Sequence, residues 1–96
     1  MTASPIATPQ PEPFFHEESG AVRFWVLDHD QHFVGASVSK EALHYRFQSG
    51  LAGTEALASY RLHRGEIDAA VRRRIATGSI EPVMLRERDM AQPPAP

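Results

Sequence analysis

The stretch TEALASYRLHRGEIDAAVRRRIATG, residues 54–78, decides the fold that we expect for this chain. Its large apolar residues recur every three or four positions, which keeps them on one face of a helix with 3.6 residues per turn. This face carries Leu57, Tyr60, Ile67, Val71 and Ile75. Thr54 is a suitable N-cap, and Gly78 suits the left-handed position that follows a helix. We therefore predict one long amphipathic helix.

Two residues of the predicted helix depart from this pattern. Gly65 lies in its middle, where glycine costs up to about 1 kcal/mol relative to alanine. It marks either a kink or a close approach of another backbone. Arg64 lies within the apolar face, where its guanidinium group either extends to water or pairs with a carboxylate. Asp89 and Glu41 are the partners that we consider for such a pair.

The first strand is predicted over residues 21–27, AVRFWVL, which are rich in Val, Phe and Trp. Alternation places one set of side chains on one face, namely Val22, Phe24 and Val26. The opposite face carries Arg23, Trp25 and Leu27. Because both faces are largely apolar, we expect the second to be covered as well, by a tail, a helix or a partner chain.

The remaining elements follow from short local signals. A second strand over residues 32–38 follows a short polar turn, which favours an antiparallel hairpin. A first, shorter helix begins after Ser39, a good N-cap, and a last strand over residues 80–85 contains Pro82. Proline cannot donate to a ladder, so this strand lies at an edge or starts after Pro82. We also expect Phe14 and Phe15 to dock on the domain, as a short strand.

This order of elements predicts a small two-layer α+β domain: an antiparallel hairpin, two helices and a final edge strand (β-β-α-α-β). Seven of the eight prolines lie near the ends of the chain. We therefore expect disordered Pro-rich tails at residues 1–13 and 91–96 and a single domain at 14–90. A core of this size is marginal, and association into a homo-oligomer would relieve that weakness.

Composition excludes several classes of function. The chain has no cysteine, so it has neither a disulfide framework nor thiolate chemistry. Its net charge of −2 lacks the basicity typical of nucleic-acid-binding proteins. No apolar run is long enough to span a membrane. The N-terminus lacks a basic start followed by an apolar stretch, so we expect a cytoplasmic protein without a membrane partner.

Several residues are candidates for a functional site. Those that we expect to contact a partner are Trp25, Tyr60, Arg64, Arg72, Arg73 and Arg74. The consecutive arginines make the helix 54–77 locally basic, which suggests phosphate contacts, although their side chains point around the helix. His29 and His32, close to two aspartates in the hairpin turn, are weak candidates for metal ligands. We expect no catalytic residue and no cofactor.

Four motifs occur in a familiar order and spacing. They are VRFW at residues 22–25, EAL at 41–43, the pair Arg64 and Ile67, and EPVML at 81–85 followed by Asp89. In this respect the chain resembles the small bacterial domain-of-unknown-function family numbered 1488. Members often end in Asp-Phe, where this chain has Asp89 and Met90. The resemblance implies a short α+β protein and supplies no activity, ligand or catalytic residue.

Taken together, these patterns favour a non-enzymatic, homo-oligomeric module that binds or regulates another macromolecule. Apolar side chains on both faces of the first strand and the small core support this hypothesis. The first alternative is a nucleic-acid-associated regulator that uses the arginine-rich helix 54–77. The second is a metal- or small-molecule-binding protein that uses the histidines.

Overall fold

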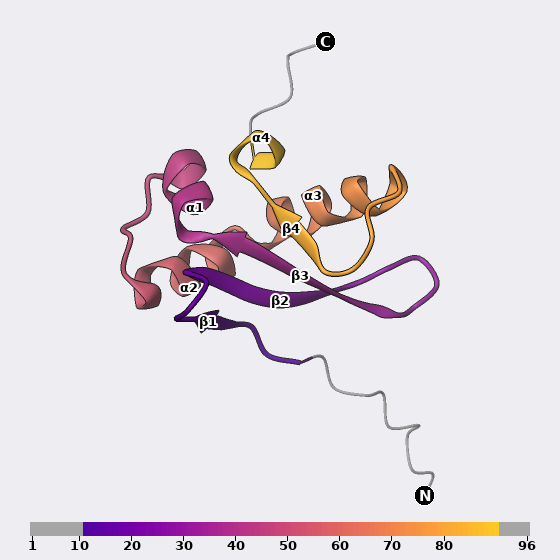
Figure 1. Cartoon of the computed structure of the whole chain (residues 1–96), viewed down its shortest axis with the longest axis horizontal. Helices are drawn as coiled ribbons and strands as arrows, with labels where there is room; N and C mark the ends of the chain where they lie inside the picture. The colour runs from indigo at the N-terminus through magenta and orange to yellow at the C-terminus, as the bar shows by residue number, and fades with distance from the viewer. Residues whose placement is uncertain (1–10, 91–96) are drawn as a thin grey trace, which may run out of the picture.

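The computed structural model describes residues 11–90, which form a four-stranded sheet and four helices (Figure 1). In chain order the elements are β1 (Phe14–His16), β2 (Ala21–Leu27), β3 (Phe33–Ser39), α1 (Lys40–Phe47), α2 (Gly53–Leu62), α3 (Arg64–Ala76), β4 (Val83–Leu85) and α4 (Glu87–Met90). The α+β class is therefore confirmed. Most of the predicted tail 1–13, and all of the tail 91–96, lies outside the described residues, so the limits of the domain stay a prediction.

The sheet has the order β1-β2-β3-β4. The first three strands are antiparallel, which confirms the predicted hairpin, whereas β4 runs parallel to β3 with Ser37 opposite Met84. Parallel neighbours require a long crossover, and here α1, α2 and α3 provide it. The last strand therefore lies at an edge, and it starts after Pro82, as its missing N–H group predicts.

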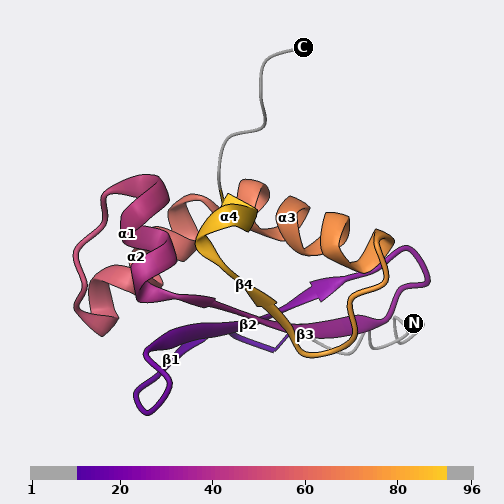
Figure 2. The same ribbon diagram turned by 45° about the horizontal axis from the view of Figure 1, so that its top comes forward.

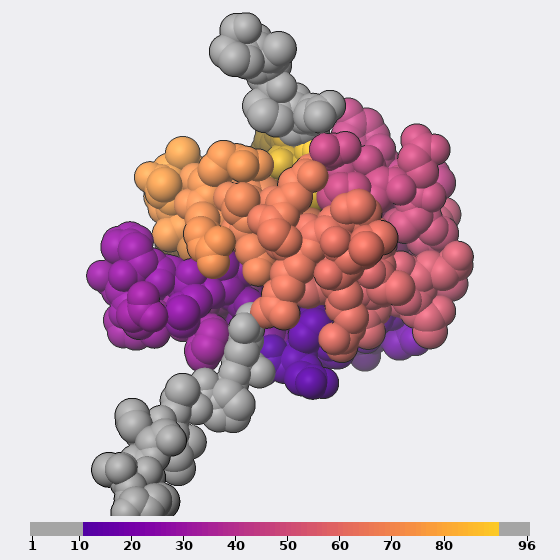
Figure 3. Space-filling model, turned by 180° about the vertical axis from the view of Figure 1, so that it is seen from behind, coloured from indigo at the N-terminus to yellow at the C-terminus, as the bar shows by residue number. Residues whose placement is uncertain are grey.

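The core lies between one face of the sheet and the helices. Val22, Phe24 and Val26 are at most 1% exposed, as the alternation in β2 predicts. The rings of Phe24 and Tyr60 in α2 are 4.5 Å apart, and both side chains are fully buried. Burying one such side chain stabilises the fold by about 2 kcal/mol. Seen from behind, α2 and α3 form the face that covers the sheet (Figure 3).

The prediction of one long helix over residues 54–78 is wrong, because the helix is interrupted at His63. The backbone of His63 has φ −111° and ψ 25°, outside the helical region, and its ring stacks on Phe47 of α1 at a centroid distance of 3.8 Å. A straight 25-residue helix would be about 37 Å long. A seven-residue strand such as β2 measures only about 23 Å, so a straight helix would overrun the sheet.

The residues predicted to begin and end the helices agree with the structure only in part. Gly78 has a φ of 96°, as predicted for the residue after a helix. Thr54 is not the N-cap, since α2 begins one residue earlier, after Ala52. A Cβ atom on Gly65 would meet nothing within 4 Å, so the predicted close approach of another backbone is wrong. Ser39 does cap α1, because its hydroxyl oxygen accepts a hydrogen bond from the Ala42 N–H group at 3.0 Å.

Two short elements of the structure are additional to the predicted order β-β-α-α-β. The short strand β1 comes from Phe14 and Phe15, which we expected to dock in this way. The short helix α4 was not predicted, because its sequence ERDM is charged and has no periodicity. Its last residue, Met90, is only 2% exposed. Met90 belongs to the hydrophobic core, and α4 contacts α1 and α3. Figure 2 shows α4 close to these helices.

Arg74 connects α3 to both segments that follow it. Its Nη1 atom donates to the Asp89 carboxylate at 2.7 Å and to the Met84 carbonyl oxygen at 3.1 Å, while its Nε atom donates to the Ser79 hydroxyl at 2.8 Å. Asp89 also accepts from the Arg86 N–H group. The guanidinium group thus occupies the outer edge of β4, which has no strand neighbour on that side.

We expect Asp89→Asn to weaken this connection without changing the shape of the side chain. The Asp89 side chain is 14% exposed, so the charge-assisted bond is largely shielded from water. The variant should lower the free energy of unfolding by about 1–3 kcal/mol, measured by urea denaturation. Glu87→Gln, an exposed change in the same helix, is the matched control. Equal stability of Asp89→Asn and wild type would contradict this role.

Candidate functional site

The face of the sheet opposite the helices holds a groove of about 750 Å³. Figure 1 looks onto this face, where none of the described helices packs over the middle of β2 and β3. Among the residues that line the groove are Arg23, Trp25, Gly35, Ser37, Ser39, Met84, Arg86 and Arg88. We call these eight residues the open-face groove. The second face of β2 was expected to be covered, and within residues 11–90 no element covers it.

The floor of the groove is the part of β3 from Gly35 to Ser39, which carries only small side chains on this face: Gly35, Ser37 and Ser39. Trp25 is the cross-strand partner of Gly35. A Cβ atom on Gly35 would lie 3.7 Å from Trp25 Nε1 and 3.0 Å from a Glu81 carboxylate oxygen. A larger residue would therefore crowd both side chains. The missing side chain of Gly35 leaves room for the indole ring beside the floor.

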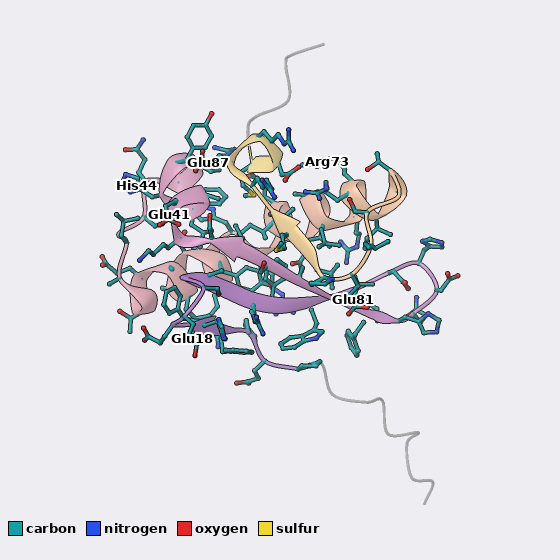
Figure 4. The ribbon with its side chains drawn as sticks, in the orientation of Figure 1. Glu18, Glu41, His44, Arg73, Glu81 and Glu87 are labelled. Atoms are coloured by element: carbon teal, nitrogen blue, oxygen red, sulfur yellow. The ribbon has the colours of Figure 1, made fainter. Side chains whose placement is uncertain are left out.

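Glu81 lies beside Gly35, at one end of the groove floor, and is not among the lining residues. Its carboxylate accepts a hydrogen bond from the Gly35 N–H group at 2.6 Å. Gly35 lies one residue before the first paired residue of β3 and β4, and the chain opposite contains Pro82, which has no N–H group. The carboxylate thus continues the hydrogen bonding of β3 beyond the end of β4. Figure 4 shows Glu81 at this end and Glu87 at the other.

Apolar side chains flank the floor on both sides. Trp25 on β2 is partly buried, and its ring lies 6.1 Å from that of Phe14 on β1. Phe14 is 42% exposed, and Met84 on β4 is 51% exposed. Exposed large apolar groups gathered on one face mark binding surfaces more often than isolated ones do. The open-face groove thus combines an indole ring and a thioether, and the phenyl ring of Phe14 lies beside the indole.

Three arginines stand along the groove: Arg23 on β2, and Arg86 and Arg88 beside β4. Glu87 is the only acidic residue among the lining residues. Within residues 11–90, none of the three arginine side chains forms an ion pair. Arg46, Arg64 and Arg74, in contrast, each pair with a carboxylate. The groove therefore carries uncompensated positive charge on a chain whose net charge is −2.

The structure separates the residues that the sequence grouped as partner contacts. Trp25 lies in the open-face groove. Tyr60 is 0% exposed, so it is a core residue and not a surface residue, and its inclusion among the contacts is corrected here. Its position on the apolar face of the helix already pointed to burial, as it does for Ile67. Arg64 begins α3, one of the helices that pack on the other face of the sheet from the groove with Trp25.

The three consecutive arginines of α3 do not form a common surface. Arg72 donates from Nε to the Leu27 carbonyl oxygen at 3.3 Å. Arg74 is bound to Asp89, Met84 and Ser79, as described above. Arg73 is exposed and points away from the sheet (Figure 4). Two of the three side chains are therefore engaged in holding the fold, which leaves little of the basic stripe that phosphate binding needs.

Arg64 pairs with Asp68, one turn along its own helix, at 3.5 Å, so neither Asp89 nor Glu41 is its partner. Asp68 also accepts a hydrogen bond from the Tyr60 hydroxyl at 3.1 Å. Burial raises the pKa of Asp68 above its ordinary value, against the opposing effects of Tyr60 and Arg64. Burial likewise raises the pKa of Tyr60. This cluster is a structural polar contact within the helical layer.

The histidines are dispersed over the described residues. His44 Nδ1 lies 2.7 Å from the Ser49 carbonyl oxygen, and His63 stacks on Phe47. In the hairpin turn, ligand atoms of Asp28, Asp30 and His32 lie within 4.8 Å of one another, while His29 is outside this group. Asp28, however, already accepts from the N–H groups of His32 and Asp30, and the former holds the pKa of its carboxyl group below the ordinary value. These contacts shape the turn.

Sequence reasoning missed four residues of this face: Phe14, Met84, Arg86 and Arg88. The alternation in β2 already placed Arg23 beside Trp25, so that half of the groove was visible in the sequence. The other half depends on β4 lying parallel to β3, which only the tertiary structure shows. No local pattern indicates that Arg86 and Arg88 face the same groove as Trp25.

We expect Asp68 to make the stability of the protein depend on pH. Its folded-state pKa lies above the unfolded value near 3.8, so the folded state binds the proton more tightly. Stability therefore falls as pH rises from 3.8 through the raised pKa. Relative to Asp68→Asn, wild type should lose free energy of unfolding between about pH 3 and pH 7, measured by urea denaturation at each pH. A difference that stays constant or grows with pH would contradict this assignment.

Comparison with known proteins gives one match. The family model described as "Protein of unknown function (DUF1488)" matches residues 9–85. The searches of curated proteins and of solved structures returned no match. None of the helices in residues 11–90 is long and apolar enough to cross a membrane. The matched residues include β1 to β4 and most of the open-face groove, and the chain belongs to the DUF1488 family of proteins of unknown function.

Proposed function

We propose that this chain is a non-enzymatic binding module that takes a macromolecular partner on its open-face groove and works as a homo-oligomer. The observation that carries the proposal is the groove itself. It combines Trp25, Met84 and three unpaired arginines on a sheet face that the described helices leave open. The expected cytoplasmic location stays a prediction from the sequence.

The residue types of the groove support binding to a protein. Aromatic residues, methionine and arginine are enriched at protein interfaces, and tryptophan and arginine dominate their binding energy. Trp25 and Phe14 lie on one side of the floor and Met84 on the other. The backbone of the sheet holds all of them in place, so a partner would meet a preformed surface.

The lining also favours binding over catalysis. Nucleophilic or acid–base catalysis needs a reactive side chain within hydrogen-bond reach of a base or acid. Glu87 is the one carboxylate among the lining residues, and the lining contains no histidine. The serines of the floor have no neighbouring base among these residues. This chemistry suits recognition of charge and shape.

The homo-oligomer is supported by exposed apolar side chains elsewhere. Tyr45 and Leu62 belong to helices, and Leu51 and Ile80 to connecting loops, with exposed fractions between 49% and 84%. They lie outside the groove lining. Association through any of these side chains would bury apolar surface that the small core leaves exposed, and it would keep the groove accessible.

The first prediction from this proposed function concerns Trp25 in the open-face groove. Trp25→Ala should remove at least about 2 kcal/mol of partner binding, because tryptophan at the centre of an interface is a typical hot spot. The measurement is capture of partners from a native lysate by immobilised full-length protein, compared with wild type by quantitative mass spectrometry. Met84→Lys, at an exposed position, tests the same surface if Trp25→Ala is unstable.

The control variant is Leu62→Ala, which removes an exposed apolar side chain from the helical side. It should retain the proteins that Trp25→Ala loses. Circular dichroism shows whether each variant is folded. If Trp25→Ala and Met84→Lys capture the same proteins as wild type, the open-face groove is not the binding surface.

The second prediction concerns assembly. Light scattering coupled to size-exclusion chromatography should give a mass that is a multiple of the 10.7 kDa of the chain. Leu62→Lys with Ile80→Lys should shift this mass towards the monomer, since both side chains are largely exposed in the single chain. A monomeric mass for wild type at high protein concentration would rule out the homo-oligomer and leave the proposed binding surface unaffected.

A further inference from the structure

We infer that the open-face groove binds an extended, acidic peptide segment of a partner protein. This inference rests on the proposed function and names the chemistry of the ligand. Three observations lead to it: the shape of the floor, the position of the unpaired arginines and the acidic residues at the two ends of the groove.

The floor has the shape of a shallow channel along β3. It runs from Gly35 to Ser39, which is about 13 Å for an extended strand. Larger side chains border the floor on both sides: Trp25 on β2 and Met84 on β4. An extended segment of about four or five residues matches this length. A helix, about 10 Å across with its side chains, is too broad for a channel between neighbouring strands.

The positive charges along the channel favour an anionic ligand. Arg23 stands on one border, and Arg86 and Arg88 stand at the other. All three are exposed and unpaired within residues 11–90. A guanidinium group matches the geometry of a carboxylate with two parallel hydrogen bonds. Acidic side chains of a bound segment would therefore find partners on both sides of the channel.

The apolar groups explain why the ligand is a peptide. Side chains of an extended segment alternate, so an apolar side chain directed at the floor can contact Trp25 or Met84 while neighbouring carboxylates reach the arginines. A nucleic-acid strand carries a phosphate at every residue. At the ends of β4 it would meet Glu81 and Glu87, which would repel its phosphates, whereas a peptide can carry its acidic side chains opposite the arginines alone (Figure 4).

A second copy of the chain fits this surface less well. Two open-face grooves placed face to face would bring the same three arginines from each copy together, with only Glu87 to compensate on each side. Like charges across an interface disfavour association. The occupant that complements the charge is a segment richer in Asp and Glu than this face.

The test is a selection from a phage-displayed library of random seven-residue peptides on the immobilised full-length chain. We expect the selected peptides to be enriched in Asp and Glu around one or two large apolar residues. One selected peptide is then synthesised, together with a counterpart in which lysine replaces each acidic residue. Binding is followed by the fluorescence of Trp25, the only tryptophan in the chain.

The double variant Arg23→Glu with Arg88→Glu should weaken binding of the acidic peptide at least about tenfold, and it should bind the lysine counterpart better than wild type does. The matched control is Arg61→Glu, at an exposed position on α2, which should leave binding unchanged. Selected peptides without an excess of Asp and Glu, or equal binding by the double variant, would overturn the inference.

Two further arms separate this inference from the proposed function. If a ten-nucleotide oligothymidylate changes the Trp25 fluorescence and the acidic peptide does not, the groove is a binding surface for nucleic acid and the peptide inference fails. If the peptides fail while Trp25→Ala still abolishes capture of a partner, the proposed function stands alone. If capture is also independent of Trp25, both fail.

Discussion

One layer of helices covers a sheet whose second strand is apolar on both faces, and this constraint shapes the rest of the molecule. Val22, Phe24 and Val26 pack beneath α2 and α3 and are removed from water. Trp25 lies between Phe24 and Val26 in β2, so its side chain is on the opposite face of the sheet. Within residues 11–90 there is no second helical layer. The described helices therefore cover one face of the sheet, and the other face carries the partly buried indole ring of Trp25.

The arginines follow the same division. Three on the helical side are bound within the fold: Arg46 and Arg64 pair with carboxylates, and Arg74 joins α3 to β4 and α4, whereas Arg61 and Arg73 are exposed. Arg23 and the two arginines beside β4 have no such partner within residues 11–90. The arginines that stabilise the fold through ion pairs therefore lie on its helical side. Charges on the open face remain available, which is why we place recognition there and not on the arginine-rich helix.

The interrupted helix shows where periodicity fails as a guide. Spacing placed Tyr60, Ile67 and Val71 correctly in the core, whereas Leu57 and Ile75 of the same predicted face are only partly buried. It missed the break at His63, because helical spacing continues across a short interruption with little change of phase. Stacking of His63 on Phe47 and the limited length of the sheet decide the break, and both are tertiary effects. The partner of Arg64, in contrast, was available from the sequence, because the i, i+4 spacing in a helix places Asp68 one turn away.

The sequence by itself determined the class of the fold, the buried face of β2, the cap at Ser39 and the start of β4 after Pro82. Each depends on a side chain or backbone group acting within a few residues. The tertiary structure alone decided that β4 lies parallel to β3, that α4 docks through Met90, and that Arg86 and Arg88 share a groove with Trp25. These features join residues that are far apart in the chain, such as Ser37 with Met84 and Trp25 with Arg88. Their positions follow from how the helices pack on the sheet, and no local pattern records that packing.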